Sequence, residues 1–287
     1  MKPLNHTKRC HLFQDISKSV WGKIIAAHSV SIDVPEIGIT ADILVQLLHF
    51  SKVAQPNFDV FTKKGWNEKT YGSDLDVFVE VGGREFVWFA LQAKVLKKNN
   101  RYTTLRDSSD ATFQWEKLAL LESATGCKGY FLLYNEKSDY VYSGKDSCKK
   151  SFNENQFGCS LVEPKEIEVL ASKKVGSKFS NPSFQDIHPD KAQPWQILVC
   201  CNQRNLTSKM YSLTQILESN PLLERVGVEN LDQEIFEDQS GFDRIDRIPP
   251  VSDNPINIAS REFGWNPSFR IIIRTTESIK NRSSNSQ

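Results

Sequence analysis

Two neighbouring segments decide the fold of this chain, Tyr71-Gly-Ser-Asp-Leu-Asp76 and Glu85-Phe-Val-Trp-Phe-Ala-Leu-Gln-Ala-Lys-Val-Leu96. In the second segment, apolar side chains occupy both alternating faces, which is typical of a central strand buried on both sides. Gln92 and Lys94 lie two residues apart and therefore share one face of this strand. A buried lysine is costly unless it is paired or serves a functional site. Lys94 is therefore the residue that any functional hypothesis must explain.

The turn at Gly82-Gly83 predicts which side chains of the two segments face one another. A strict two-residue loop would put Asp74 on the wrong face for Gln92. A three-residue loop, which often has glycine in the left-handed position, instead sets Phe78 opposite Trp88 and Asp74 opposite Gln92. Because a one-residue slip would turn every side chain to the other face, the match of apolar residues selects this second register.

A carboxylate on the preceding helix extends this group of polar residues. Glu36 heads the apolar stripe of a helix expected over residues 35–50, so it is predicted to face the sheet. Asp33 and Glu36 also match a D-x-x-E capping box, and this alternative explains Glu36 equally well. Asp74, Gln92 and Glu36 together offer oxygen ligands of the kind that Mg²⁺ accepts, with Mn²⁺ as an alternative.

The chemistry that this group suits is the hydrolysis of a phosphodiester. A bound metal lowers the pKa of its water, and the ammonium of Lys94 is suited to positioning that water or stabilising the transition state. The following run, Lys97-Lys-Asn-Asn-Arg101, has the composition of a solvated loop. Its position next to Lys94 also suits contact with a phosphate backbone through Lys97, Lys98 and Arg101.

Other polar residues nearby have a structural explanation. Asp76 and Glu80 share the face of Asp74 and are expected to form a solvated strand surface. Gln114 lies on a helix expected over residues 112–124, where a glutamine is most often a surface residue, although a supporting role at the site is the alternative.

The same residues resemble the PD-(D/E)XK (restriction-endonuclease-like) nuclease superfamily, over about residues 31–140. The resemblance rests on the helix with Glu36, on Gly72-Ser73-Asp74, on Gln92-Ala93-Lys94 and on the helix with Gln114. Within the superfamily, the sequence is most similar to bacterial defence-associated proteins with a Gly-x-Asp and Gln-Ala-Lys core. The resemblance implies an Mg²⁺-dependent endonuclease with Asp74, Gln92 and Glu36 as metal ligands, Lys94 as a catalytic residue and Gln114 in support.

Two positions depart from the superfamily pattern. Ser73 stands in place of the proline of the motif, which is a common change. Gln92 replaces the acidic residue, so the metal site has one negative charge fewer than the motif implies. This second departure favours an alternative, a nuclease-fold module that binds nucleic acid or a partner protein with weak or no catalysis. A third alternative is an assembly subunit that uses residues 176–275 as its partner surface.

The order of expected elements over residues 36–134 is α-β-β-β-α-β, in which an antiparallel meander is followed by a crossover helix. This order predicts an α/β fold, a restriction-endonuclease-like core with a mixed central sheet flanked by helices, followed by a mostly helical and loop C-terminal extension. We expect the following organisation of the chain: an N-terminal helical segment (1–30), a nuclease-like core (31–175), a C-terminal extension (176–275) and a disordered tail (276–287).

Composition restricts the partners and the compartment. The net charge of +1 over 287 residues argues against a strongly basic surface but leaves room for a local basic groove. No apolar run approaches the ~20 residues of a membrane span, and the N-terminus lacks the apolar core of a secretory signal. The 6 cysteines form no CxxC pair and suit reduced thiols. We therefore expect a cytoplasmic protein that binds no membrane, and the resemblance implies nucleic acid, DNA rather than RNA, as its partner. A protein partner or a homo-oligomer is a further option.

Overall fold

The computed structural model describes residues 4–54, 58–63, 73–82, 84–103, 105, 113–145, 151–175, 178–200, 209–218, 223–226, 242–243 and 267–274. Its helices are α1 (Leu4–Ser29), α2 (Glu36–Ala54), α3 (Gln114–Thr125), the 3₁₀ helix η2 (Glu154–Gly158), α4 (Pro164–Ala171), α5 (Phe184–Ile187), α6 (Ile197–Cys200) and α7 (Leu213–Glu218). Its strands are β1 (Phe58–Lys63), β2 (Ser73–Gly82), β3 (Glu85–Val95), β4 (Lys128–Tyr134), β5 (Ser143–Lys145), β6 (Ser151–Asn153), β7 (Cys159–Val162), β8 (Lys174–Val175), β9 (Lys178–Phe179), β10 (Ala192–Pro194), β11 (Met210–Ser212), β12 (Leu223–Val226), β13 (Phe242–Asp243) and β14 (Pro267–Ile273). The fold is mixed α/β.

The chain forms two compact units, each built from segments that are distant in sequence. Unit 1 comprises Met1–Ile43, Leu91–Ala119 and Gly129–Gln203, and unit 2 comprises Leu44–Ala90, Leu120–Lys128 and Arg204–Gln287. Strand β3 contributes its first residues to unit 2 and its last residues to unit 1. Every residue of β3 after Glu85 is buried, so the predicted strand with two apolar faces is confirmed.

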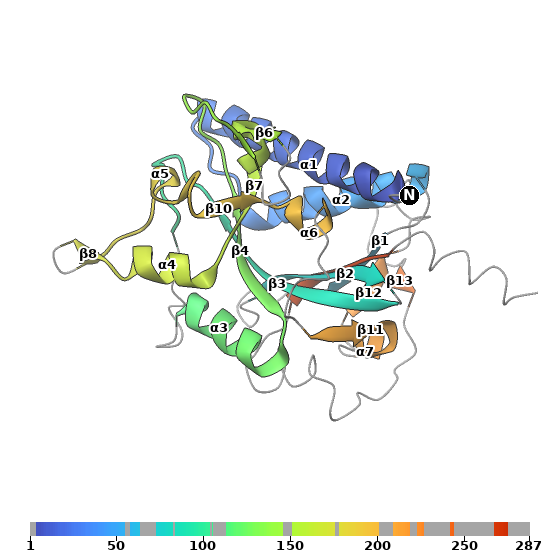
Figure 1. Cartoon of the computed structure of the whole chain (residues 1–287). Coiled ribbons are helices and arrows are strands. Elements are labelled where there is room, and N and C mark those ends of the chain that lie inside the picture. The colour runs from blue at the N-terminus through green and yellow to red at the C-terminus, as the bar shows by residue number, and fades with distance from the viewer. Residues whose placement is uncertain are drawn as a thin grey trace, which may run out of the picture. The chain divides into compact units, whose positions relative to one another are not determined.

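In unit 2 the strands are ordered β3-β2-β14-β1-β12-β13, and β11 pairs with β3 (Figure 1). Strand β14 runs parallel to β2, with Phe269 opposite Leu75, and antiparallel to β1. The expected meander of three consecutive strands is therefore wrong, because a strand from the end of the chain lies between β1 and β2. The sequence Phe269-Arg-Ile-Ile-Ile273 is buried along its whole length, which favours a central place in a sheet.

Arg84 is the described residue between β2 and β3. Arg84 has a φ of 64°, so an arginine takes the left-handed position that the sequence suggested for glycine. The rings of Phe78 and Trp88 stack with their centroids 5.7 Å apart, which confirms the cross-strand contact predicted for that register.

Asp76 and Glu80 are buried, at 0% and 5% exposure, so the prediction of a solvated strand surface is wrong for both. Asp76 accepts a hydrogen bond from Nε1 of Trp88 at 2.8 Å and forms an ion pair with Nη2 of Arg270 at 3.0 Å. Arg270 comes from β14, the strand that sequence order did not place beside β2. Burial lowers the pKa of Arg270, and the charge of Asp76 opposes that shift.

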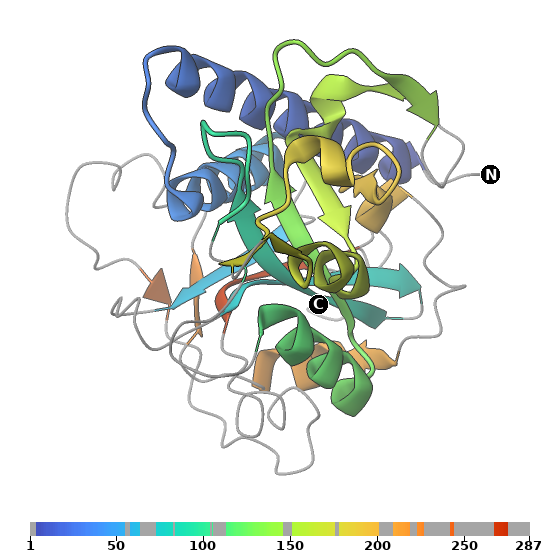
Figure 2. The same ribbon diagram turned by 90° about the vertical axis from the view of Figure 1, so that its left-hand side faces the viewer.

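In unit 1 the strands are ordered β10-β7-β4, followed by the end of β3, and β4 and β7 are antiparallel with Leu132 opposite Leu161 (Figure 2). Helix α1 packs against η2, α6 and β7. Gly158 permits this approach, since a Cβ atom there would overlap the backbone oxygen of Ser17. None of the helices in the described ranges is long and apolar enough to cross a bilayer.

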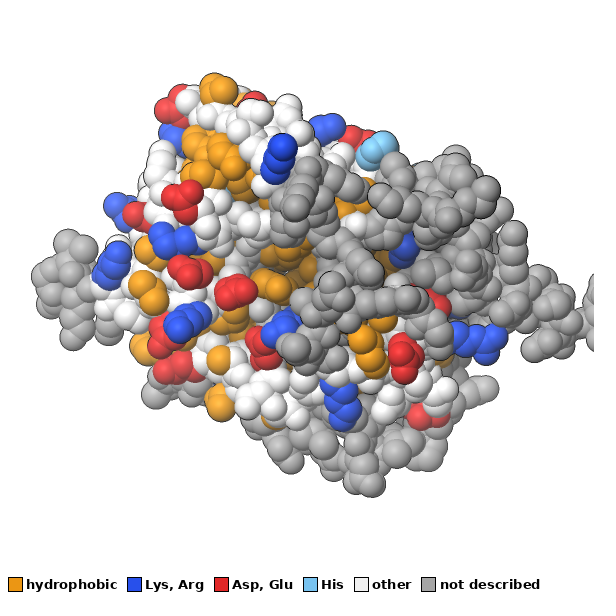
Figure 3. All heavy atoms as spheres, viewed as in Figure 1, with side chains coloured by type: hydrophobic (Ala, Val, Ile, Leu, Met, Phe, Trp, Pro, Cys, Tyr) orange, Lys and Arg blue, Asp and Glu red, His pale blue; other side chains and the backbone are white. Residues whose placement is uncertain are grey.

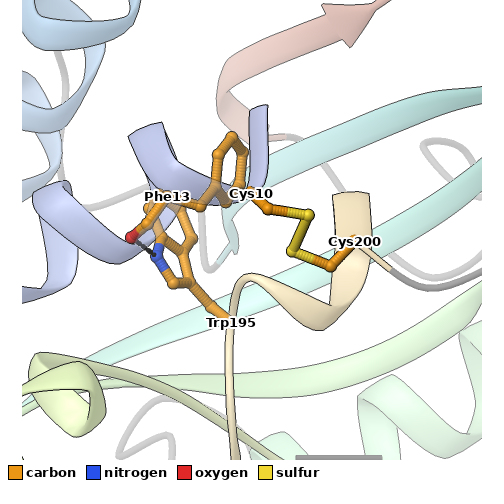
Figure 4. Close-up of a disulfide and its surroundings, with 4 residues drawn as sticks. All are labelled: Cys10, Phe13, Trp195 and Cys200. Carbon is orange, nitrogen blue, oxygen red and sulfur yellow. Dashed lines mark hydrogen bonds between the residues drawn. A yellow bond between two sulfur atoms is a disulfide. The ribbon is translucent and has the colours of Figure 1, made fainter. Parts of the chain in front are cut away.

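A disulfide joins Cys10 of α1 to Cys200 of α6, with Cα atoms 5.1 Å apart (Figure 4). Beside it, the ring centroids of Phe13 and Trp195 lie 4.3 Å apart, and Nε1 of Trp195 donates to the backbone oxygen of Phe13. The prediction that the cysteines are reduced thiols is wrong for this pair. The partners are separated by 190 residues and meet only through the packing of α1 on α6, which local spacing does not reveal.

The tail expected over residues 276–287 lies outside the described residues, as do Cys148 and Cys201.

Candidate functional site

The structure brings Glu36 and Lys94 together. Nζ of Lys94 lies 3.6 Å from Oε1 of Glu36. The lysine side chain is only 6% exposed, whereas the glutamate side chain is 29% exposed. Lys94 projects from the buried end of β3, and Glu36 is the first residue of α2. A buried lysine is thus paired with a glutamate whose side chain is partly exposed.

The capping-box alternative for Glu36 is wrong. A capping box needs Asp33 as the N-cap with Glu36 already three residues into the helix. Helix α2 instead begins at Glu36, and the first helical hydrogen bonds, from Gly38 and Ile39, go to the backbone oxygen of Pro35. The Asp33 carboxylate accepts a hydrogen bond from the backbone nitrogen of Lys98 at 3.0 Å.

The remaining predicted site residues lie on three elements. Gln92 is 4% exposed and shares the strand face of Lys94. Asp74 is half-buried on β2 and belongs to unit 2, so its pairing with Gln92 stays a prediction from the sequence. Gln114 begins α3, and its Oε1 atom is buried with no hydrogen-bond partner among the described residues.

Tyr134 at the end of β4 ties together the two elements that carry the ion pair. Its hydroxyl lies 2.9 Å from Oγ1 of Thr40, which also donates to the backbone oxygen of Glu36. Its backbone oxygen accepts a hydrogen bond from the nitrogen of Leu96 at 2.9 Å. One residue therefore holds the first turn of α2 and the strand end that follows Lys94.

The basic residues after Lys94 lie in a tight turn. The nitrogen of Lys97 donates to the oxygen of Arg101, and Asn100 takes a left-handed φ of 61°. Lys97 is half-buried, while Lys98 and Arg101 are exposed. Nζ of Lys98 donates to Oγ of Ser31 at 2.6 Å. A guanidinium nitrogen of Arg101 donates to the backbone oxygen of Asn181, also at 2.6 Å. On the face that Figure 3 shows, basic and acidic side chains of the described residues are interspersed.

A histidine that sequence reasoning missed lies next to this turn. Nδ1 of His28 is 2.9 Å from Oε1 of Glu136, and its Nε2 is 3.6 Å from Oδ1 of Asp33. The three residues are separated by up to 108 positions, so no spacing in the sequence marks them as a group.

The donor set for a metal is small. Within the described ranges, no group of three His, Cys, Asp or Glu side chains is arranged to hold a metal ion. The predicted ligands comprise two carboxylates and one amide oxygen, so a metal here would keep several waters, as Mg²⁺ commonly does. The oxygen chemistry of Glu36 and Gln92 therefore fits a hard cation that is only partly enclosed by protein.

These features define a mixed α/β protein whose central strand carries a buried lysine paired with a solvent-accessible glutamate. The chain belongs to DUF6615, a family of unknown function whose model matches residues 9–278. Neither a curated protein nor a solved structure matches the chain.

Proposed function

We propose that this protein is a metal-dependent nuclease that hydrolyses phosphodiester bonds, with DNA as the preferred substrate. The resemblance of Gly72-Ser73-Asp74 and Gln92-Ala93-Lys94 to the PD-(D/E)XK superfamily suggests the class. Its likeness to defence-associated members suggests a role in bacterial anti-phage defence in the cytoplasm. The mixed α/β fold agrees with this proposal at the level of fold class.

The observation that carries the proposal is the asymmetry of the Glu36–Lys94 pair. A lysine side chain that is 6% exposed is held beside a glutamate side chain that is 29% exposed. A fixed cation beside an anionic metal ligand suits both the positioning of an attacking water and the binding of a phosphate oxygen. The ties of Thr40 and Tyr134 to α2 and β3 would keep this geometry preorganised.

Each residue has a separate role in the proposed reaction. Glu36 and Gln92 would hold Mg²⁺ or Mn²⁺, which when bound supplies an acidic water and neutralises phosphate charge, and the sequence resemblance implies Asp74 as a further ligand. Lys94 would orient the attacking water and stabilise the charge that develops on the phosphate. Lys98 and Arg101, with Lys97, would contact the nucleic-acid backbone, and Gln114 would support the site.

A second candidate function is a binding module without catalysis, and the observation that favours it is Gln92. An amide oxygen binds a hard cation more weakly than a carboxylate, so a protein that only binds nucleic acid or a partner protein would tolerate it. The two functions differ in one measurable outcome, because a binding module retains the substrate without cleaving it.

The test is cleavage of plasmid, linear DNA and RNA by the purified chain with Mg²⁺, Mn²⁺ or EDTA. Lys94→Met keeps most of the buried side chain and removes the ammonium, so cleavage should fall at least ~10²-fold, the typical effect of losing one electrostatic stabiliser. A thermal melt of the same sample shows whether the fold survives. Binding without cleavage by the wild type would select the second function, and wild-type cleavage by a folded Lys94→Met variant would refute the mechanism.

Lys23→Met is the matched control. Lys23 forms an ion pair with Asp42 at 2.7 Å in the same unit, and its side chain is 41% exposed. This variant also removes an ion-paired lysine, but at a site without a proposed catalytic role. Its cleavage rate should equal that of the wild type.

A further inference from the structure

His28 lies in the last turn of α1, near two carboxylates that belong to different segments. Its side chain is 8% exposed, with Glu136 at 2.9 Å from Nδ1 and Asp33 at 3.6 Å from Nε2. Glu136 follows β4, and Asp33 lies in the loop between α1 and α2. Nδ1 is within hydrogen-bond distance of Glu136, whereas Nε2 is buried and makes no hydrogen bond within the described part of the chain. The ring therefore joins the end of α1 to the segment after β4 and lies against Asp33 of the α1–α2 loop.

Asp33 also connects the α1–α2 loop to the basic turn. It accepts the backbone hydrogen bond of Lys98 at 3.0 Å, while the Lys98 ammonium donates to Ser31 at 2.6 Å. Glu36 follows Asp33 by three residues, and Lys94 precedes Lys98 by four. The segments that flank both partners of the ion pair are thus joined at Asp33. Since the Asp33 side chain is 49% exposed, its contacts with Lys98 alone would be weak in water.

We propose that His28 is a positioning residue, which holds Asp33 and through it the 30–36 segment, so that Glu36 lies opposite Lys94. The consequence for catalysis rests on the proposed nuclease function. The anchoring itself is a property of unit 1 and can be measured whether or not the protein cleaves nucleic acid.

Three substitutions separate the two contacts of the ring. His28→Asn places an amide nitrogen near the position of Nδ1 and keeps the contact with Glu136, whereas His28→Gln reaches the position of Nε2 and keeps the contact with Asp33. His28→Ala removes both contacts. His11→Ala is the matched control, because His11 is an exposed histidine on the same helix.

The experiment is amide hydrogen exchange of the full chain at constant pH. His28→Ala and His28→Asn should raise exchange over residues 30–38 by about tenfold or more, as expected when an anchored loop opens locally. His28→Gln should retain protection there, and His11→Ala should match the wild type. Unchanged exchange at 30–38 in His28→Ala would overturn the proposal. An equal rise throughout the chain would also overturn it, because His28 would then stabilise the whole fold.

A second measurement connects the anchoring to the site. Calorimetric titration with Mn²⁺ and the cleavage assay are repeated on the same variants. Weaker cation binding and slower cleavage in His28→Ala, restored in His28→Gln, would support positioning of Glu36. If exchange rises at 30–38 while binding and cleavage match the wild type, His28 does not position Glu36 and the proposal fails. If the wild type neither binds Mn²⁺ nor cleaves, the proposed function fails, and the exchange data still decide the anchoring.

Discussion

The ion pair between Asp76 and Arg270 allows a quantitative test of the sheet order in unit 2. Asp76 is 0% exposed and Arg270 is 3% exposed. The Asp76→Asn substitution keeps an oxygen for the hydrogen bond from Trp88 but removes the charge opposite Arg270. The guanidinium would then remain buried without the charge of Asp76, although it still donates to the backbone oxygen of Ile216.

The expected cost is large because the remaining charge has no access to water. Removing one partner of a buried pair costs about 3–5 kcal/mol, compared with a total stability of roughly 5–15 kcal/mol for a typical domain. For a domain of this size, that loss lowers the melting temperature by roughly 6–20 °C. Arg270→Met should have a similar effect. The double variant should cost less than the sum of the two, since it leaves no isolated charge.

Thermal and urea unfolding of the four proteins, followed by near-UV circular dichroism, gives the coupling free energy. We expect a coupling of at least about 2 kcal/mol. The exposed pair of Asp15 and Lys18, with side chains 70% and 46% exposed, is the control and should show well under 1 kcal/mol, or about zero. Additive effects of Asp76→Asn and Arg270→Met would refute the placement of β14 beside β2.

Two further predictions concern pH and metal affinity. Burial lowers the pKa of His188 to about 3, against the opposing effect of its hydrogen bond to Phe184. As the pH is lowered, the unfolded chain therefore takes up a proton on this histidine before the folded protein does. The contribution of neutral His188 to the free energy of unfolding is thus complete above pH ~6.5 and is smaller by about 2 kcal/mol at pH 5. The free energies of unfolding at pH 7.5 and pH 5 should differ less in His188→Gln than in the wild type, and an equal difference would contradict the lowered pKa. Gln92→Glu should tighten Mn²⁺ binding in calorimetry, because it adds a negative charge on the face of Lys94, and unchanged or weaker binding would exclude Gln92 as a ligand.

Sequence reasoning predicted best the strands whose own composition indicates whether they are buried. β3 has apolar residues on both faces, and that composition alone indicates burial on both sides. The contact between Phe78 and Trp88 followed from the same local information, because the hydrophobic match and the turn length agreed. Glu36 was also predicted to face the sheet, since it heads the apolar stripe of its helix.

The features that sequence reasoning missed depend on partners far along the chain. Asp76 was expected to be exposed to water, because no residue near it in the sequence indicated a partner that would bury it. Its partner Arg270 comes 194 positions later. The same reason accounts for the disulfide of Cys10 with Cys200 and for the contact of His28 with Glu136. In each case the residue type was compatible with several environments, and only the packing of distant segments selected one.

The pairing of Lys94 with Glu36 changes the functional argument that its burial first suggested. A buried lysine needs a counter-charge, and Glu36 supplies one, so burial by itself no longer indicates catalysis. A pair with only a structural role gains most when both charges are shielded, because their attraction is strongest in a medium of low dielectric constant. Here the glutamate side chain is 29% exposed while the lysine side chain is 6% exposed, so the anionic partner is the one more open to solvent. A cation or a substrate can approach the pair from that side, and the buried glutamine on the same strand face, Gln92, offers an oxygen of the kind that such a cation binds.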